Sequence, residues 1–132
     1  MKHEILIYNK TKRKIPKKFI RSVIIKALDF LKLKQPVEMA VLVVDKEEIK
    51  RLNKIWRKKN TTPDELSFGL NSRQMAKVAN DDNRVLNLGE IVVNSEEVSD
   101  KKYLSKISIH GLLHLSGYSH GQIESLENKI FI

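Results

Sequence analysis

The spacing of apolar residues divides the first part of the chain into a strand, a helix and a second strand. Residues 3–9 (HEILIYN) place the β-branched Ile5 and Ile7 on one face, which predicts a strand. Between Pro16 and the break at Gln35-Pro36, apolar residues recur every three or four positions and predict a helix. The run VEMAVLVV (residues 37–44) predicts the next strand.

A second helix is expected immediately afterwards. Asp45 and Glu48 form a D-x-x-E helix-start signal, and Ile49, Leu52 and Trp56 continue an apolar face. We therefore favour core packing for Trp56 over the alternative, stacking on a nucleic-acid base. A loop by composition (residues 58–65) and a short strand, LSFGL, follow.

The second half predicts a hairpin and then helices. Residues 71–84 are polar and are expected to join LSFGL to the strand VLNLGEIVVN (residues 85–94). Asp100 is a predicted cap for a helix over residues 101–116, which Gly117 ends. The tail ESLENKIFI predicts a short final helix.

This order predicts an α+β fold in a single domain over residues 1–132. We expect a mixed, mostly four-stranded sheet with about four to five helices, mostly on one face. The opening strand–helix–strand unit is expected to form a parallel pair through a right-handed crossover.

Composition narrows the chemistry. The chain has no cysteine, so any metal site must use His, Asp or Glu. No apolar run reaches the roughly 18 residues that span a bilayer, and the first residues are interpreted as a strand rather than a signal peptide. The expected location is cytoplasmic, with no membrane association.

Charge is distributed unevenly along the chain. Residues 1–59 contain 18 Lys and Arg against 6 Asp and Glu, whereas residues 60–132 contain 7 against 10. A basic half beside a slightly acidic half favours a surface that binds a polyanion such as nucleic acid. A solvated lysine-rich surface is the alternative interpretation.

Three of the four histidines lie in HGLLHLSGYSH (residues 110–120). His110 and His114 are four apart on a predicted helix and therefore point the same way. Gly117 allows the chain to reverse, so His120 can supply a third ligand. Three histidines on one Zn²⁺ leave an open coordination position, which is typical of a catalytic rather than a structural zinc site.

The same spacing occurs in the zinc-protease pattern H-E-x-x-H-x-x-G-x-x-H, except that Gly111 replaces the general-base glutamate. Water activation must then come from the metal or from another residue, for which Glu90 is a candidate. A small metallopeptidase is therefore one alternative function. A non-catalytic RNA- or ribosome-binding module, stabilised by a metal ion, is another.

Three sequence blocks resemble the YbeY family of metal-dependent endoribonucleases. HGLLHLSGYSH is similar to the family's H-G-x-L-H-L-x-G-Y-D-H. LNKIWRKKNTTPDELSF (residues 52–68) resembles L-N-x-x-[aromatic]-R-x-x-D-x-P-T-D-V-L-S-F, and LGEIVV (residues 88–93) resembles L-G-D-I-V-I. The blocks occur in the family's order.

The resemblance implies a cytoplasmic bacterial enzyme that cleaves single-stranded RNA with one Zn²⁺ per chain. It further implies maturation of the small-subunit ribosomal RNA at its 3′ end and quality control of ribosomes, with ribosomal RNA and the small subunit as partners. Carried over by position, the zinc ligands are His110, His114 and His120, and the functional arginine is Arg57.

Further substrate contacts are expected near Arg57. Lys54, Lys58 and Lys59 are candidates for phosphate binding. Asp64 is a candidate because the family pattern has an aspartate there, and Ser67 because its hydroxyl can donate to the substrate.

This chain also departs from the family's signatures. Ser119 stands where the signature has an aspartate. Such a carboxylate would orient a metal ligand. Without it, metal affinity is expected to be lower by roughly 10- to 100-fold, unless another group replaces it.

Overall fold

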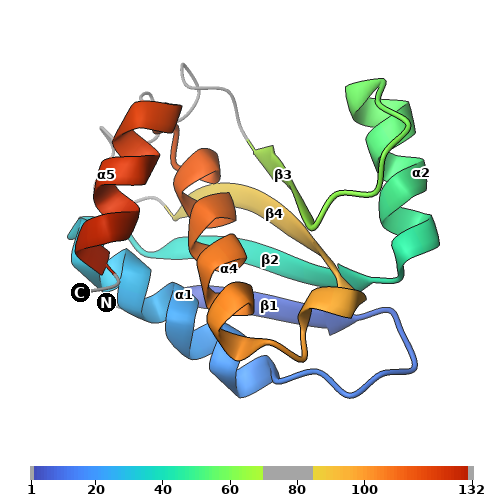
Figure 1. Ribbon diagram of the computed structural model, residues 1–132. Helices are drawn as coiled ribbons and strands as arrows, with labels where there is room; N and C mark the ends of the chain where they lie inside the picture. Colours follow the sequence, from blue (N-terminus) through green and yellow to red (C-terminus); the bar gives the residue numbers. More distant parts are fainter. Residues whose placement is uncertain (1, 70–84, 131–132) are drawn as a thin grey trace.

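The computed structural model describes residues 2–69 and 85–130, in which helices flank a mixed four-stranded sheet (Figure 1). The strands are β1 (Glu4–Asn9), β2 (Val37–Val44), β3 (Glu65–Gly69) and β4 (Leu86–Asn94). The α-helices of the described part are α1 (Lys17–Leu31), α2 (Lys46–Arg57), α4 (Lys101–Leu115) and α5 (His120–Ile130), and a 3₁₀ turn, η1, covers Ser95–Glu97. The predicted α+β class and four-stranded mixed sheet are confirmed.

The strands follow the order β1-β2-β4-β3. β1 pairs with β2 in parallel, which confirms the pair predicted for the opening strand–helix–strand unit. β2 pairs with β4 in parallel, and β3 pairs with β4 antiparallel as the predicted hairpin requires. The expected connection over residues 71–84 lies outside the described residues. Because β4 lies between β2 and β3, β3 forms an edge of the described sheet.

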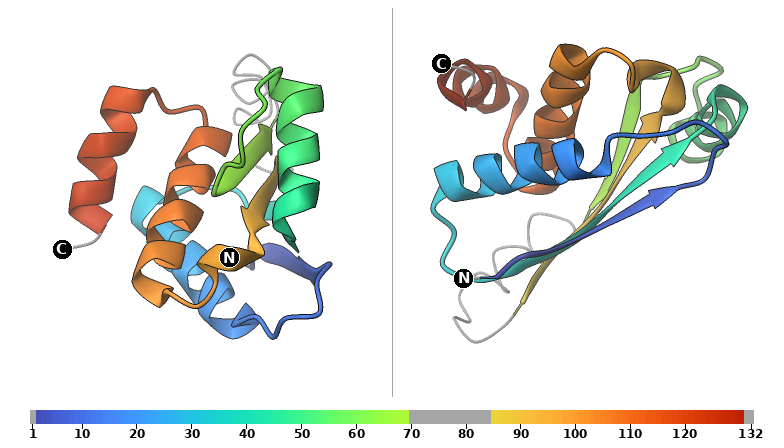
Figure 2. Two further views of the ribbon diagram at one scale, coloured as in Figure 1. Left: turned by 45° about the vertical axis from the view of Figure 1, so that its right-hand side comes forward. Right: turned by 90° about the horizontal axis from the view of Figure 1, so that it is seen from below.

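The two faces of the sheet are covered differently. Helices α1 and α4 lie across one face with α5 beyond α4, whereas α2 lies on the opposite side, over the β3–β4 end (Figure 2). The larger apolar core fills the space beneath α1, α4 and α5. A smaller cluster, formed by Val44, Ile49, Leu66 and Val92, lies beneath α2. None of the described helices is long and apolar enough to cross a membrane.

Capping side chains fix the starts of α2 and α4, which carry predicted site residues. Asp45 accepts a hydrogen bond from the Glu48 backbone N–H at 2.9 Å, and Asp100 accepts one from the Tyr103 N–H at 3.1 Å. At the other end of α4, Gly117 has a φ of +87°, which favours glycine and lets the chain turn. The predicted bounds of this helix are confirmed to within one residue.

The final helix begins four residues earlier than predicted, at His120 rather than Glu124. Ser119 and Gln122 form a capping box: the Ser119 N–H donates to Gln122 Oε1 at 2.9 Å, and the Gln122 N–H approaches Ser119 Oγ at 3.4 Å. His120 therefore lies in the first turn of α5, not in a loop before it.

The prediction that Trp56 packs in the core is wrong, because its side chain is 65% exposed. α2 buries Ile49 against the sheet and Asn53 against the following loop, where its Nδ2 donates to Thr61, but the last turn of α2 lies at the edge strand, where Arg57 donates to Ser67. The Trp56 ring meets the Phe68 ring edge-on, at 6.4 Å between centroids, and leaves its remaining surface in solvent.

Candidate active site

The three histidines of the sequence motif lie together where α4 meets α5. The Nε2 atoms of His110 and His114 are 3.0 Å apart, and the two ring centroids are separated by 4.6 Å. The His120 ring lies 5.1 Å from the His114 ring. The structure thus brings together the side chains that the helix spacing and the glycine turn predicted to be neighbours.

A carboxylate that the sequence did not reveal orients the first of these rings. His110 Nδ1–H donates to Glu127 Oε1, on α5, at 2.7 Å, and only 15% of the Glu127 side chain is exposed. The opposite ring nitrogen, Nε2, is left facing His114. Metal-binding histidines usually have such an outer partner, and Glu127 is a carboxylate in that position relative to His110.

Burial lowers the pKa of His114 below its ordinary value, and the nearby positive groups of His110, His120 and Arg57 lower it further. The neutral ring is therefore favoured. A neutral imidazole keeps the lone pair that metal coordination needs.

The spacing of the histidine nitrogens is close to that of two ligands on one zinc ion. Two nitrogens bound to a tetrahedral zinc at roughly 2.0–2.1 Å lie about 3.3 Å apart, close to the 3.0 Å between His110 and His114. Across the described ranges, no three His, Asp or Glu side chains already stand as a complete metal site. The Nε2 atoms of His110 and His114 therefore have nearly the spacing that zinc requires, and the His120 ring lies next to His114.

Arg57 approaches the cavity beside His114 from the other side of the β3 edge. It ends α2, and its Nη2 donates to the Ser67 backbone oxygen at 2.9 Å. Together with His114 and Glu65 it lines a cavity of about 250 Å³. The residue predicted to bind phosphate and a predicted metal ligand therefore share one cavity.

Glu65 is the second residue that the sequence did not reveal. Ser67 Oγ donates to Glu65 Oε2 at 3.0 Å, and a Cβ added to Gly111 would lie 3.2 Å from the same oxygen. Burial raises the pKa of Glu65, although the Ser67 hydrogen bond, His110 and Arg57 oppose this effect. Gly111 thus leaves room for a carboxylate from β3 beside the histidine helix.

The remaining predicted residues surround this centre. The Ser67 hydroxyl is engaged by Glu65, and Asp64 accepts a hydrogen bond from the Tyr103 hydroxyl, which raises the pKa of Tyr103 to about 12. Asp64 and His110 line a neighbouring cavity of about 280 Å³.

The predicted phosphate-binding lysines and the alternative base lie elsewhere. Lys54, Lys58 and Lys59 are exposed around the last turn of α2, next to Arg57. Glu90 pairs in register with Phe68 and lines a groove beneath α2, on the face of the sheet away from α4. It is therefore not the carboxylate beside the histidines.

Comparisons with known proteins identify the family to which this chain is similar. A family model described as "Endoribonuclease YbeY" matches residues 6–131. A protein of that name from a Sulfurihydrogenibium species is 31% identical over 146 residues, covering 98% of this chain and 91% of the relative. Another from Persephonella marina is 30% identical over 135 residues, covering 90% and 84%.

A solved structure has a similar fold. The solution structure of TM1509 from Thermotoga maritima is similar with a TM-score of 0.57 and 25% sequence identity. The alignment covers 96% of this chain and 85% of that one.

Proposed function

The chain belongs to the endoribonuclease YbeY family, and from this premise we propose that it cleaves single-stranded RNA with a metal ion held by His110, His114 and His120. Its biological substrate in this proposal is ribosomal RNA of the small subunit, matured at the 3′ end and monitored during ribosome quality control in the cytoplasm. Residues 1–132 act as one catalytic domain. The observation that carries the proposal is the cavity shared by His114 and Arg57.

Zinc is the cation best suited to three imidazole donors, although Ni²⁺ and Co²⁺ have affinity for the same ligands. When bound, such an ion supplies Lewis acidity, which activates a water molecule and stabilises negative charge on a phosphate oxygen. Glu127 holds the His110 ring so that Nε2 remains directed at the site.

Arg57 binds the phosphate that is attacked. Its guanidinium can donate two parallel hydrogen bonds to phosphate oxygens and offset the charge that develops on them. The Ser67 oxygen fixes one nitrogen of the guanidinium at 2.9 Å, which limits its freedom before substrate binds. Lys54, Lys58 and Lys59 bind neighbouring phosphates and make affinity depend on salt.

Glu65 is placed to accept the proton that the nucleophile loses, whether that nucleophile is water or the substrate's own 2′-hydroxyl. Its raised pKa favours such a role, because a base works best when its pKa approaches the working pH. Ser67 holds Oε2 in position at 3.0 Å.

A metallopeptidase is the second candidate, and Glu65 favours it as well, because a carboxylate beside Gly111 replaces the base that the protease pattern has. Arg57 and the three exposed lysines favour RNA, since a peptide bond gives them no phosphate to bind. Cleavage of a peptide substrate at matched metal loading separates the two functions.

The test combines elemental analysis with cleavage of a single-stranded RNA, with and without chelator. We expect about one zinc per chain, and loss of cleavage when it is removed. His114→Ala should lose both metal and activity, and Arg57→Ala should keep the metal while losing roughly 10²- to 10³-fold in turnover.

Arg21→Ala, which removes an arginine on α1, is the matched control and should cleave normally. Activity that survives both site substitutions would contradict the proposed site. Metal binding without any cleavage would favour the non-catalytic RNA-binding module instead.

A further inference from the structure

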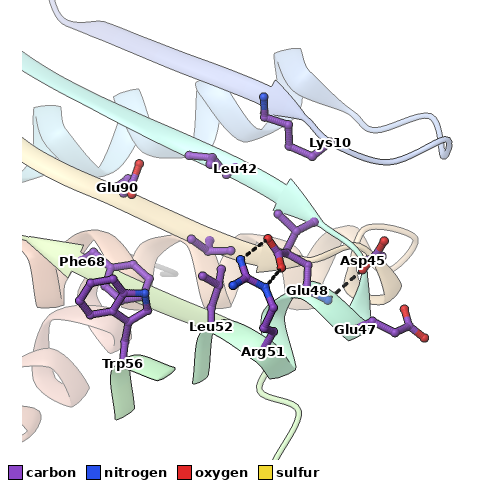
Figure 3. Close-up of a pocket in the computed structure, with 12 residues that line it drawn as sticks. Lys10, Leu42, Asp45, Glu47, Glu48, Arg51, Leu52, Trp56, Phe68 and Glu90 are labelled. Atoms are coloured by element: carbon purple, nitrogen blue, oxygen red, sulfur yellow. Dashed lines mark hydrogen bonds and ion pairs between the residues drawn. The ribbon is translucent and has the colours of Figure 1, made fainter. Parts of the chain in front are cut away.

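A groove of about 900 Å³ lies on the face of the sheet opposite the histidines (Figure 3). Leu42, Val44 and Val92 form its floor, and α2, from its N-cap Asp45 to Trp56, forms one side. Trp56 and Phe68 lie side by side at one end of it. Nothing in the proposed chemistry uses this surface.

The aromatic pair presents an open flat surface. Trp56 is 65% exposed, and the two rings meet edge-on with an interplanar angle of 71°. Most of the indole ring is therefore left in solvent beside Phe68. A flat π-system in solvent is a suitable partner for another flat π-system.

The aromatic pair is continuous with the phosphate site. The Arg57 guanidinium carbon lies 6.0 Å from the Phe68 ring centroid, while Nη2 of the same side chain reaches the Ser67 oxygen. Ser67 and Phe68 are successive residues of the edge strand, so their side chains point to opposite faces. An RNA strand with one phosphate bound to Arg57 can therefore pass over the edge of β3 and place a neighbouring base in the groove.

The charges of the groove favour a base over a phosphate. Carboxylates of Asp45, Glu47, Glu48 and Glu90 line it, against the two cations Lys10 and Arg51, of which Arg51 is already bound to Glu48 at 2.5 Å. These carboxylates repel phosphate from the interior. The exposed Lys54, Lys58 and Lys59 lie beside Arg57, where they can bind the phosphates of the RNA backbone outside the groove.

We propose that Trp56 and Phe68 stack an unpaired base of the RNA, in the nucleotide next to the one whose phosphate binds Arg57. The inference deepens the proposed ribonuclease function and rests on it. A base must leave its stack to enter the groove, which favours single strands over duplexes. Every base has a π-face, so the subsite tolerates any sequence.

Trp56 is the one tryptophan in the sequence, so its fluorescence reports on this site alone. The full chain is titrated, with chelator present to keep the RNA intact, with a short single-stranded RNA and with an abasic strand of equal length and charge. Intact RNA should quench the fluorescence, whereas the abasic strand should leave it nearly unchanged.

Affinity is measured by anisotropy of a labelled RNA. Trp56→Ala should weaken binding by about 5- to 150-fold, and Trp56→Phe should restore most of the loss. The slope of log affinity against log salt should stay the same, because the phosphate contacts remain. Ile55→Ala is the matched control, since Ile55 precedes Trp56 and is 48% exposed.

The outcomes separate this inference from the function on which it rests. RNA binding that leaves the fluorescence unchanged, or a Trp56→Ala variant with full affinity, overturns the base subsite while the ribonuclease proposal stands. In that case the groove would be a binding surface for a protein segment instead of a base. Failure of the unaltered protein to bind any RNA overturns both.

Discussion

The two faces of β3 differ in composition and in packing. On the side of α4, Glu65 and Ser67 form a hydrogen-bonded polar pair against Gly111. On the side of α2, Leu66 is buried and Phe68 supports the exposed Trp56. One five-residue strand therefore carries partly buried polar groups on one face and a partly open apolar surface on the other.

From this difference we expect one face of β3 to serve bond cleavage and the other to serve substrate binding. Partly buried, mutually oriented polar groups suit bond cleavage, because their charges act with little screening by water. An open apolar surface suits binding and tolerates varied ligands. Substitutions on the first face should change turnover, and substitutions on the second should change affinity.

The largest effect is expected for Glu65→Gln, which keeps the shape of the side chain and removes the proton acceptor. Turnover should fall by roughly 10²- to 10⁴-fold, the usual contribution of a general base, with little change in KM. Steady-state cleavage of a single-stranded RNA measures both. Glu38→Gln on β2 is the control, and a loss of only a few-fold at position 65 would leave proton removal to the metal alone.

A smaller effect is expected for Glu127→Gln, which weakens the partner of His110 Nδ1. Zinc affinity, measured by competition with a chromogenic chelator, should fall by roughly 10- to 100-fold. RNA affinity in chelator should be unchanged, because Glu127 lies on the α4 side of the sheet. Glu124 is an exposed glutamate of the same helix, and Glu124→Gln should leave both quantities unaltered. Unchanged zinc affinity in the Glu127 variant would mean that Glu127 only helps to pack α5 against α4.

The smallest effect concerns stability, and here the substitution is expected to increase the measured quantity rather than decrease it. Burial raises the folded-state pKa of Glu65 above its ordinary value, so its contribution to stability is full below the unfolded pKa and is lost as pH rises through the folded pKa. Metal-free Glu65→Gln should therefore melt above the unaltered protein near pH 7, with the gap closing toward pH 4. A gap that widens in acid would reverse the sign assigned here.

Much of the fold follows from local pattern. The β-branched runs, the apolar stripe of α1 and the caps at Asp45 and Asp100 specify their elements through neighbours a few residues away. The adjacency of His110 and His114 follows from helix geometry in the same way.

The remaining features depend on contacts between distant segments. Periodicity placed Trp56 on the sheet-facing side of α2, but it carries no information about where the sheet ends. Glu65 lies beside the histidine helix only because Gly111, far along the chain, lets α4 approach β3. Glu127 likewise meets His110 through the packing of α5 on α4.

The hydrogen bond from Arg57 to Ser67 has a second consequence, for self-association. In the described sheet β3 has a partner on one side alone, and an unpaired strand edge is a template on which another chain can add a strand. Arg57 occupies one outward backbone acceptor of that edge and places a positive charge beside it. The side chain proposed to bind phosphate therefore also discourages edge-to-edge aggregation.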